Sequence, residues 1–160
     1  MSKFAVAAAL ALLPINALGA QEIRRIAPGA FPIAASVEVP PGSRLVYVSG
    51  TVPDAVNKDA AAGSVERFGD TEAQTRSVLT KIEALLKPHE MTMGDVVMMR
   101  VFLVAPPGQQ RMDFAGMMRG YSRFFGTAAQ PNRPARSTMA VAGLVDPGWL
   151  VEIEVTAARK

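Results

Sequence analysis

The sequence predicts a single α+β domain in which helices cover one face of a β-sheet. Stretches with strand-like apolar patterns are interleaved with two segments of helical spacing, in the order strand, strand, helix, strand, helix, strand, strand. The chain has 160 residues, enough for one domain with its own core, and it contains neither an internal repeat nor a linker.

The composition excludes several classes of function. Hydrophobic residues make up 49 % and charged residues 19 % of the chain, as in an ordinary globular protein. The lack of cysteine excludes disulfides, thiolate zinc sites and cysteine nucleophiles, and the single histidine, His89, excludes sites that need two. The net charge of +3 is scattered rather than clustered, so we expect no nucleic-acid partner. We find no phosphate-binding glycine loop and no metal-ligand spacing, and we expect neither metal nor cofactor.

Residues 1–20 have the layout of a secretory signal peptide. A basic start precedes an apolar run at residues 4–13, and small residues follow, which predicts cleavage near Gly19 or Ala20. The apolar run is too short for a transmembrane anchor. We therefore expect a mature domain of residues 21–160 that is periplasmic or secreted and free of the membrane. The alternative is a buried N-terminal helix.

The first half of the domain reads as two strands followed by a helix. Residues 31–39 and 44–50 have strand character and end at turn signals, and residues 51–69 read as a loop. Residues 71–89 predict a helix, with capping-box spacing between Thr71 and Gln74. Its apolar stripe is formed by Val78, Leu79, Ile82, Leu85 and Leu86.

The second half predicts one buried strand, a second helix and two final strands. Residues 95–106 are nearly all apolar, which is typical of a strand buried on both faces. Residues 112–126 have helical spacing, and residues 137–144 and 149–158 read as strands joined by an Asp-Pro-Gly turn. The apolar side of this second helix is core or, as an alternative, a ligand groove; it comprises Met112, Ala115, Met117, Met118, Tyr121 and Phe125.

Arg136 is the first candidate for a functional side chain. Arginine presents a planar fork of donors that matches a carboxylate and does not lose its charge. Pro134 stiffens the approach to Arg136, and the backbone N–H groups of Ser137 and Thr138 follow directly as further donors. The alternative is a surface arginine or a structural ion pair.

Two glutamates on the last predicted strand form the second candidate. Strand alternation puts Glu152 and Glu154 on one face. If that face is buried near Arg136, one carboxylate can orient or deprotonate a water molecule. The alternatives are a solvent-facing strand side, or an ion pair with Arg100, which lies within the most apolar strand.

Ser49 and Gly50 lie at the end of the second strand. No histidine stands at a spacing that would activate Ser49, so a serine nucleophile is disfavoured. Gly50 permits a close approach of backbone to a ligand, and we expect a backbone contact here instead.

Several segments together resemble the RidA/YjgF family of reactive-intermediate deaminases. The matching segments are LVYVSGTVP, LLKPHEMTMGDVVMMRVFL, DFAGMMRGYSRFF, RPARSTMAV and VEIEVTAA, which run in order over residues 31–158. The resemblance implies a fold like that of chorismate mutase from bacilli, with a mixed sheet and two helices on one face. It also implies homotrimers with clefts where neighbouring subunits meet.

The resemblance also implies a reaction and the residues that perform it. Arg136 would hold the carboxylate of a 2-imino acid, and Glu152 would act on the hydrolytic water. The reaction would convert 2-iminopropanoate, 2-iminobutanoate or imines with larger apolar side chains to 2-keto acids and ammonia, without a cofactor. The cleft would further be lined by Ser49, Gly50, Tyr121 and Thr138, the last through its backbone and at a position where deaminase members often carry cysteine.

Two positions depart from the pattern of the deaminases. Ile33 stands where those members usually have tyrosine, and Met118 replaces an asparagine of the second helix. Both changes make the pocket more apolar, which implies a shift toward a more hydrophobic imino acid or a loss of activity. The alternative function is that of a trimeric protein that binds a carboxylate metabolite without turning it over. Endoribonuclease activity, also associated with the family, finds little support in a chain with one histidine and no basic patch.

Overall fold

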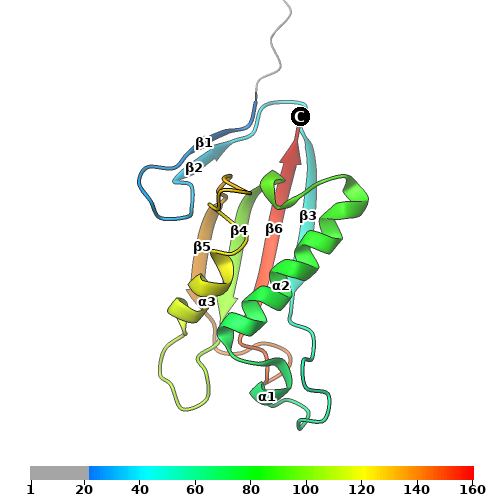
Figure 1. The fold of residues 1–160 in the computed structure, drawn as a ribbon, viewed down its shortest axis with the longest axis vertical. Coiled ribbons are helices and arrows are strands. Elements are labelled where there is room, and N and C mark those ends of the chain that lie inside the picture. The colour runs from blue at the N-terminus through cyan, green and yellow to red at the C-terminus, as the bar shows by residue number, and fades with distance from the viewer. Residues whose placement is uncertain (1–21) are drawn as a thin grey trace, which may run out of the picture.

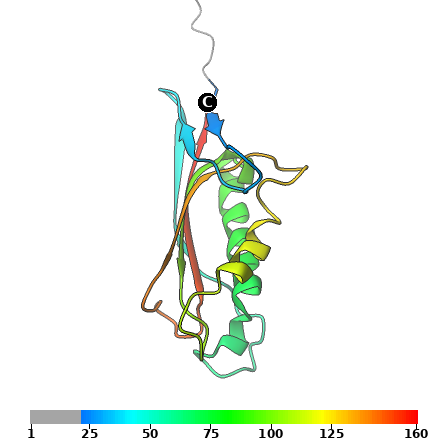
Figure 2. The same ribbon diagram turned by 90° about the vertical axis from the view of Figure 1, so that its left-hand side faces the viewer.

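Two helices cover one face of a four-stranded mixed sheet in the computed structural model, which describes residues 22–160 (Figures 1 and 2). The strand order is β3-β6-β4-β5, with β4 and β5 parallel and the other neighbours antiparallel. This confirms the predicted α+β class. The strands are β3 (Arg44–Thr51), β4 (Val96–Leu103), β5 (Ala135–Ala140) and β6 (Val151–Arg159).

The remaining elements are short apart from α2. A separate two-stranded sheet pairs β1 (Arg24–Ile26) with β2 (Ser36–Glu38). The helices are α1 (Val65–Phe68), α2 (Thr71–Leu86) and α3 (Phe114–Tyr121), with 3-10 turns at Lys87–His89 and Met93–Asp95. The predicted signal peptide and its cleavage point lie outside the described residues. Within residues 22–160, no helix combines the length and apolarity needed to cross a membrane.

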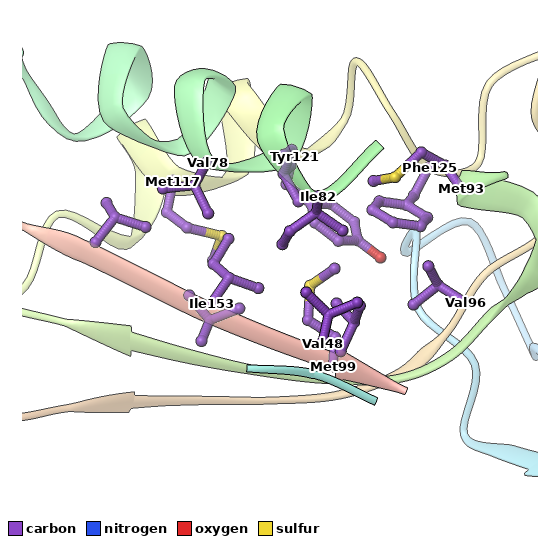
Figure 3. Packing of buried hydrophobic residues seen from close by; sticks show 14 of the residues in the cluster. Val48, Val78, Ile82, Met93, Val96, Met99, Met117, Tyr121, Phe125 and Ile153 are labelled. Atoms are coloured by element: carbon purple, nitrogen blue, oxygen red, sulfur yellow. The ribbon is translucent and has the colours of Figure 1, made fainter. Parts of the chain in front are cut away.

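The core lies between the two longer helices and the sheet (Figure 3). Alternation in β6 buries Val151, Ile153 and Val155 against the helices. The helices contribute four fully buried side chains to the same core: Val78 and Ile82 from α2, and Met117 and Tyr121 from α3. Figure 3 shows further members of this cluster. Burial of such side chains from water contributes about 1.5–3 kcal/mol each.

The opposite face of the sheet carries no helix (Figure 2). Arg100 of β4 lies there and forms an ion pair with Glu154, its register partner on β6. The prediction that residues 95–106 form a strand buried on both faces is therefore wrong within one chain. The apolar run is buried on the helix side, whereas Met98 and Phe102 are only partly covered and Arg100 is exposed.

The first helix differs from its prediction at its start. The N-cap is Asp70, whose carboxylate accepts from the Ala73 N–H at 2.8 Å, so the capping box at Thr71 and Gln74 is wrong. Gln74 is fully buried instead, and Leu85 leaves the apolar stripe with 49 % of its surface exposed. The helix ends at Leu86, before the 3-10 turn that contains Pro88.

The elements after β4 are of the kinds that the sequence predicts, but the last two strands are connected differently. The second helix begins at Phe114, after the N-cap Asp113, and is shorter than predicted, leaving Ala115 exposed. The Asp-Pro-Gly turn does not close a hairpin, because β6 inserts between β3 and β4 while β5 pairs in parallel with β4. The sequence patterns missed β1 and α1, which are only 3 and 4 residues long.

We predict that Gln74→Ala lowers the free energy of unfolding by about 3 kcal/mol, because it leaves several buried backbone groups unpaired. The Gln74 amide donates to the carbonyls of Gly69 and Gly148, both at 2.9 Å, and accepts from the Leu150 N–H at 2.7 Å. Urea unfolding at fixed protein concentration measures the change. The exposed Gln109→Ala is the control, and equal stabilities of the two variants would contradict the assigned role.

Candidate functional site

Arg136 lies on β5 with its side chain on the helix-covered face. Its register partner Met99 is fully buried under the helices, and the guanidinium contacts residues of α3. Helix α3 is held close to α2, since a Cβ added to Gly120 would lie 2.8 Å from the Cβ of Thr75. The ion pair of Arg119 with Glu72, at 2.7 Å, fastens the same contact. The packing of α3 on α2 therefore fixes the wall against which Arg136 rests.

Aromatic rings and thioethers form the surroundings of the Arg136 guanidinium. Its central carbon lies 4.3 Å from the ring centroid of Tyr121 and 5.9 Å from those of Phe31 and Phe114. One Nη atom is 3.3 Å from the Met118 sulfur. Among residues 22–160, no carboxylate pairs with this guanidinium. Burial lowers the pKa of Arg136, and the Tyr121 hydroxyl opposes this, but an arginine stays charged.

The side chains around the guanidinium, Phe31, Phe114, Met118 and Tyr121, are called the Arg136 cage below. The segment before β2 forms one side of this cage. The Tyr121 hydroxyl donates to the Pro32 carbonyl at 2.7 Å. Arg133 donates to the carbonyls of Gly29 and Phe31 at 2.9 and 3.3 Å. Burial raises the pKa of Tyr121 and outweighs the opposing effect of the Arg136 charge. The hydroxyl therefore remains protonated and keeps its hydrogen bond to the Pro32 carbonyl. The loop is thus anchored on both sides of Phe31.

Thr138 contributes its backbone at the open edge of the sheet. The Val141 N–H donates to the Leu103 carbonyl of β4, so by alternation the N–H of Ser137 also faces β4. The N–H of Thr138 therefore points to the other side, where β5 is an edge strand bridged only at Ala135 within the described residues. Only one of the two donors predicted beside Arg136 is thus available to a ligand.

Ser49, Gly50 and Glu152 form a second group on the helix-free face. Ser49 and Gly50 lie at a register irregularity between Val48 and Thr51 of β3. A Cβ added to Gly50 would lie 1.8 Å from a carboxylate oxygen of Glu152. With any other residue at position 50, the Glu152 carboxylate would have to move. Glu154 lies on the same face and forms an ion pair with Arg100.

The two groups lie on opposite faces of one sheet. Glu152 alternates with the buried Val151 and Ile153 and so points away from the helices, whereas Arg136 contacts α3. Strand β4 also separates β6 from β5, a lateral distance of about 10 Å. The structure thus brings Arg136, Tyr121, Met118 and Thr138 together, and it brings Glu152, Gly50 and Ser49 together. It does not bring the two groups together within one chain.

Two cage residues, Phe31 and Phe114, were missed by the sequence patterns. Ile33 packs against the edge of the core, and Phe31, two positions earlier, reaches the guanidinium instead. Phe114 stands four and seven residues before Met118 and Tyr121, a helical spacing that identifies it in retrospect. Among the described residues there is no group of three or more histidine, aspartate or glutamate side chains that would hold a metal ion.

Comparison with known proteins identifies the family. The family model described as Endoribonuclease L-PSP matches residues 30–159. The chain belongs to the RidA/YjgF family. It is 38 % identical to a RutC family protein of Haemophilus influenzae over 116 residues, 72 % of this chain and 80 % of that protein.

Two further relatives of this RidA/YjgF chain have informative names. It is 33 % identical to the 3-aminoacrylate deaminase RutC of Acinetobacter baylyi, over 79 % of this chain and 88 % of that protein. The crystal structure of E. coli TdcF with bound serine superposes with a TM-score of 0.57 at 26 % identity. That comparison covers 88 % of this chain and 99 % of the other. The similarity spans nearly all of the described domain.

We predict that Arg136→Met leaves the free energy of unfolding unchanged or raises it by about 1 kcal/mol, because it removes a half-buried charge that has no counter-charge among residues 22–160. Arg159→Met is the matched control. Arg159 binds the Asp95 carboxylate at 2.5 and 3.1 Å, and its loss is expected to destabilise the chain. Thermal and urea unfolding compare the two, and a clear destabilisation by Arg136→Met would indicate a structural role.

Proposed function

We propose that this chain is an imine/enamine deaminase that hydrolyses 2-imino acids, of the 2-iminopropanoate and 2-iminobutanoate type, to 2-keto acids and ammonia. The half-buried Arg136 guanidinium carries the proposal, since no carboxylate of the described residues neutralises it. Its planar fork matches a carboxylate in two parallel hydrogen bonds. The name of the Acinetobacter baylyi relative, a 3-aminoacrylate deaminase, supports the choice of reaction.

The proposed chemistry uses few groups. Arg136 binds the substrate carboxylate, with the outward N–H of Thr138 as a further donor. Water adds to the electrophilic imine carbon while Glu152 accepts one of its protons. Glu152 returns this proton to the nitrogen, which gives a neutral carbinolamine. Glu152 then takes the hydroxyl proton as the carbonyl forms and the C–N bond breaks, and it passes that proton to the nitrogen, which departs as ammonia. The imine is already reactive, so positioning it against water accounts for most of the catalysis.

The proposed site requires more than one chain. Because Arg136 and Glu152 lie on opposite faces of the sheet, a small substrate reaches both only if the helix-covered edge of one subunit meets the open face of another. A cyclic homotrimer supplies such a head-to-tail contact three times. The exposed apolar residues of β3, Leu45 at 43 % and Tyr47 at 75 %, are consistent with a surface that an adjoining subunit covers.

A binding protein for carboxylate metabolites is the second candidate. It is favoured by the thioether of Met118, which stands 3.3 Å from the guanidinium and offers no proton to a reacting group. A cleft built in this way holds a carboxylate through Arg136 whether or not Glu152 reaches the substrate. The solved TdcF structure contains serine, a small amino acid with such a carboxylate.

We predict that the chain accelerates imine loss when an amino-acid oxidase generates 2-imino acids from amino acids in the assay. Arg136→Ala and Glu152→Gln are each expected to lower kcat/KM by about 100-fold or more. Glu154→Gln is the matched control, because it removes a carboxylate from the same strand and face, and it should retain activity. Lack of acceleration by the folded wild-type protein would support the binding role instead.

Mixing the two inactive variants tests whether the site is shared. If one subunit supplies Arg136 and the next supplies Glu152, trimers reassembled from equal amounts of both variants contain intact sites, about a quarter of the total in a cyclic trimer. Activity should then return to about that fraction of the wild-type value. If activity does not return after verified subunit exchange, the site is not shared in this way: either both groups act within one subunit, or one of them takes no part in catalysis.

We further propose that residues 1–20 export the protein and are removed. The support is the basic, apolar and small-residue order of the segment. When the chain is expressed from residue 1 in a Gram-negative host, we expect it in the periplasm. Its measured mass should correspond to a chain that begins at Ala20 or Gln21. Leu10→Arg, which places a charge in the apolar run, should retain the uncleaved chain in the cytoplasm. A full-length periplasmic product would contradict cleavage.

A further inference from the structure

A cavity of about 510 Å³ opens where β5 ends, beside the connection from β4 to α3. In Figure 1 this connection hangs below α3, at the end toward which β4 and its parallel partner β5 run. The volume is in the range of pockets that hold small ligands. Most of the lining is apolar, and it is formed by Ala105, Gln110, Arg111, Met112, Phe114, Ala140 and Val141.

The cavity adjoins the Arg136 cage. Phe114 lines the cavity and also lies 5.9 Å from the guanidinium, so one ring borders both. Alternation along β5 puts Arg136, Thr138 and Ala140 on one face, so this row leads from the guanidinium to the cavity wall. Phe114 is 37 % exposed, which leaves its ring accessible from outside.

The dimensions select a kind of ligand. From Arg136 to Ala140 the strand advances about 13 Å, whereas the nearer wall of the cavity, the Phe114 ring, lies 5.9 Å from the central carbon of the Arg136 guanidinium. A ligand whose carboxylate lies on the guanidinium therefore needs a side chain the size of leucine or phenylalanine to reach the cavity. A methyl side chain would leave it empty. The lining also contains two polar residues, Gln110 and Arg111, both exposed to solvent.

Two other hollows of the described surface lack this combination. The cavity on the open face, of about 250 Å³, contains the Arg100–Glu154 ion pair, so its arginine is already neutralised. The hollow beside Arg25 and Arg133 has about 360 Å³, and both arginines there donate to backbone carbonyls. Of these three hollows, the cavity beside Phe114 is the one that joins an apolar chamber to an arginine that no carboxylate among residues 22–160 neutralises.

We propose that this cavity is the side-chain pocket of the Arg136 site, and that it selects 2-imino acids with a long apolar or aromatic side chain. The imino group of this ligand rests on the proposed function, whereas the size and polarity of its side chain rest on the geometry of the cavity. Selection at this pocket depends on the β4–α3 connection and on the end of β5, which are distinct from Ile33 and Met118.

Filling the cavity from each wall tests the assignment. Wild-type protein should hydrolyse the imines derived from leucine and phenylalanine with a kcat/KM about 10-fold or more above that for the alanine-derived imine. Ala140→Phe, from β5, and Ala105→Leu, from the connection, should each reduce this preference by about 10-fold. Val145→Phe, at a residue 92 % exposed in a loop outside the cavity lining, is the control and should keep it.

A binding measurement separates this inference from the proposed function. Calorimetry with pyruvate, 4-methyl-2-oxopentanoate and phenylpyruvate uses the same carboxylate and side chains without catalysis. Tighter binding of the larger keto acids, weakened by Ala140→Phe or Ala105→Leu, supports the pocket even if no imine is hydrolysed. Imine hydrolysis that shows no side-chain preference, with both filled variants equal to the control, would overturn the pocket while leaving the deaminase function intact.

Discussion

The guanidinium of Arg136, which no carboxylate among residues 22–160 neutralises, is the constraint on which the rest of the site depends. A half-buried charge without a counter-charge is costly to a fold unless its surroundings compensate. Here three aromatic rings and two methionine sulfurs provide weak, diffuse stabilisation. None of these neighbours occupies the donors as a carboxylate would. The cage therefore holds the charge in place and leaves its hydrogen-bond donors without a carboxylate partner among the described residues, as the proposed binding of an anion requires.

Holding that cage requires elements from distant parts of the chain. The short helix α3 supplies Tyr121 and Phe114, and it is fixed by its close contact with α2 at Gly120. The segment before β2 supplies Phe31, and Arg133 and Tyr121 bind its carbonyls. The sheet itself contributes only the position of Arg136 on an edge strand. Edge placement matters because it leaves the N–H of Thr138 facing outward beside the arginine.

Local patterns in the sequence predicted most of the longer elements, and the limits of these patterns have physical causes. Alternation in VEIEV correctly placed Glu152 and Glu154 on one face, and the spacing of α2 identified most of its buried stripe. Alternation could not reveal that Arg136 faces the other side, because the faces of β5 and β6 are related only through their pairing with β4. The Asp-Pro-Gly turn looked like a hairpin for the same reason: strand order is decided by long-range pairing.

Gln74 illustrates a second limit. A glutamine near a helix start fits a capping box in sequence, but the residue is recruited into the core to satisfy backbone groups at the beginning of β6. Phe31 likewise depends on a contact with Arg136, far along the chain, and the cavity beside Phe114 joins residues 105–114 to residues 140–141. Local periodicity carries no information about either contact.

The arrangement separates the parts that stabilise the fold from the parts that select a ligand. The core joins α2 to β6 and β4, and Gln74 fastens it to the loops at one end. The candidate pocket is built instead from the end of an edge strand and from the β4–α3 connection, both at the margin of that core. Loops and edges tolerate changes in size better than a close-packed interior does. Under the proposed function, changes at the end of β5 or in the β4–α3 connection would alter the selected side chain, while Arg136 keeps its place on β5 as the proposed carboxylate anchor.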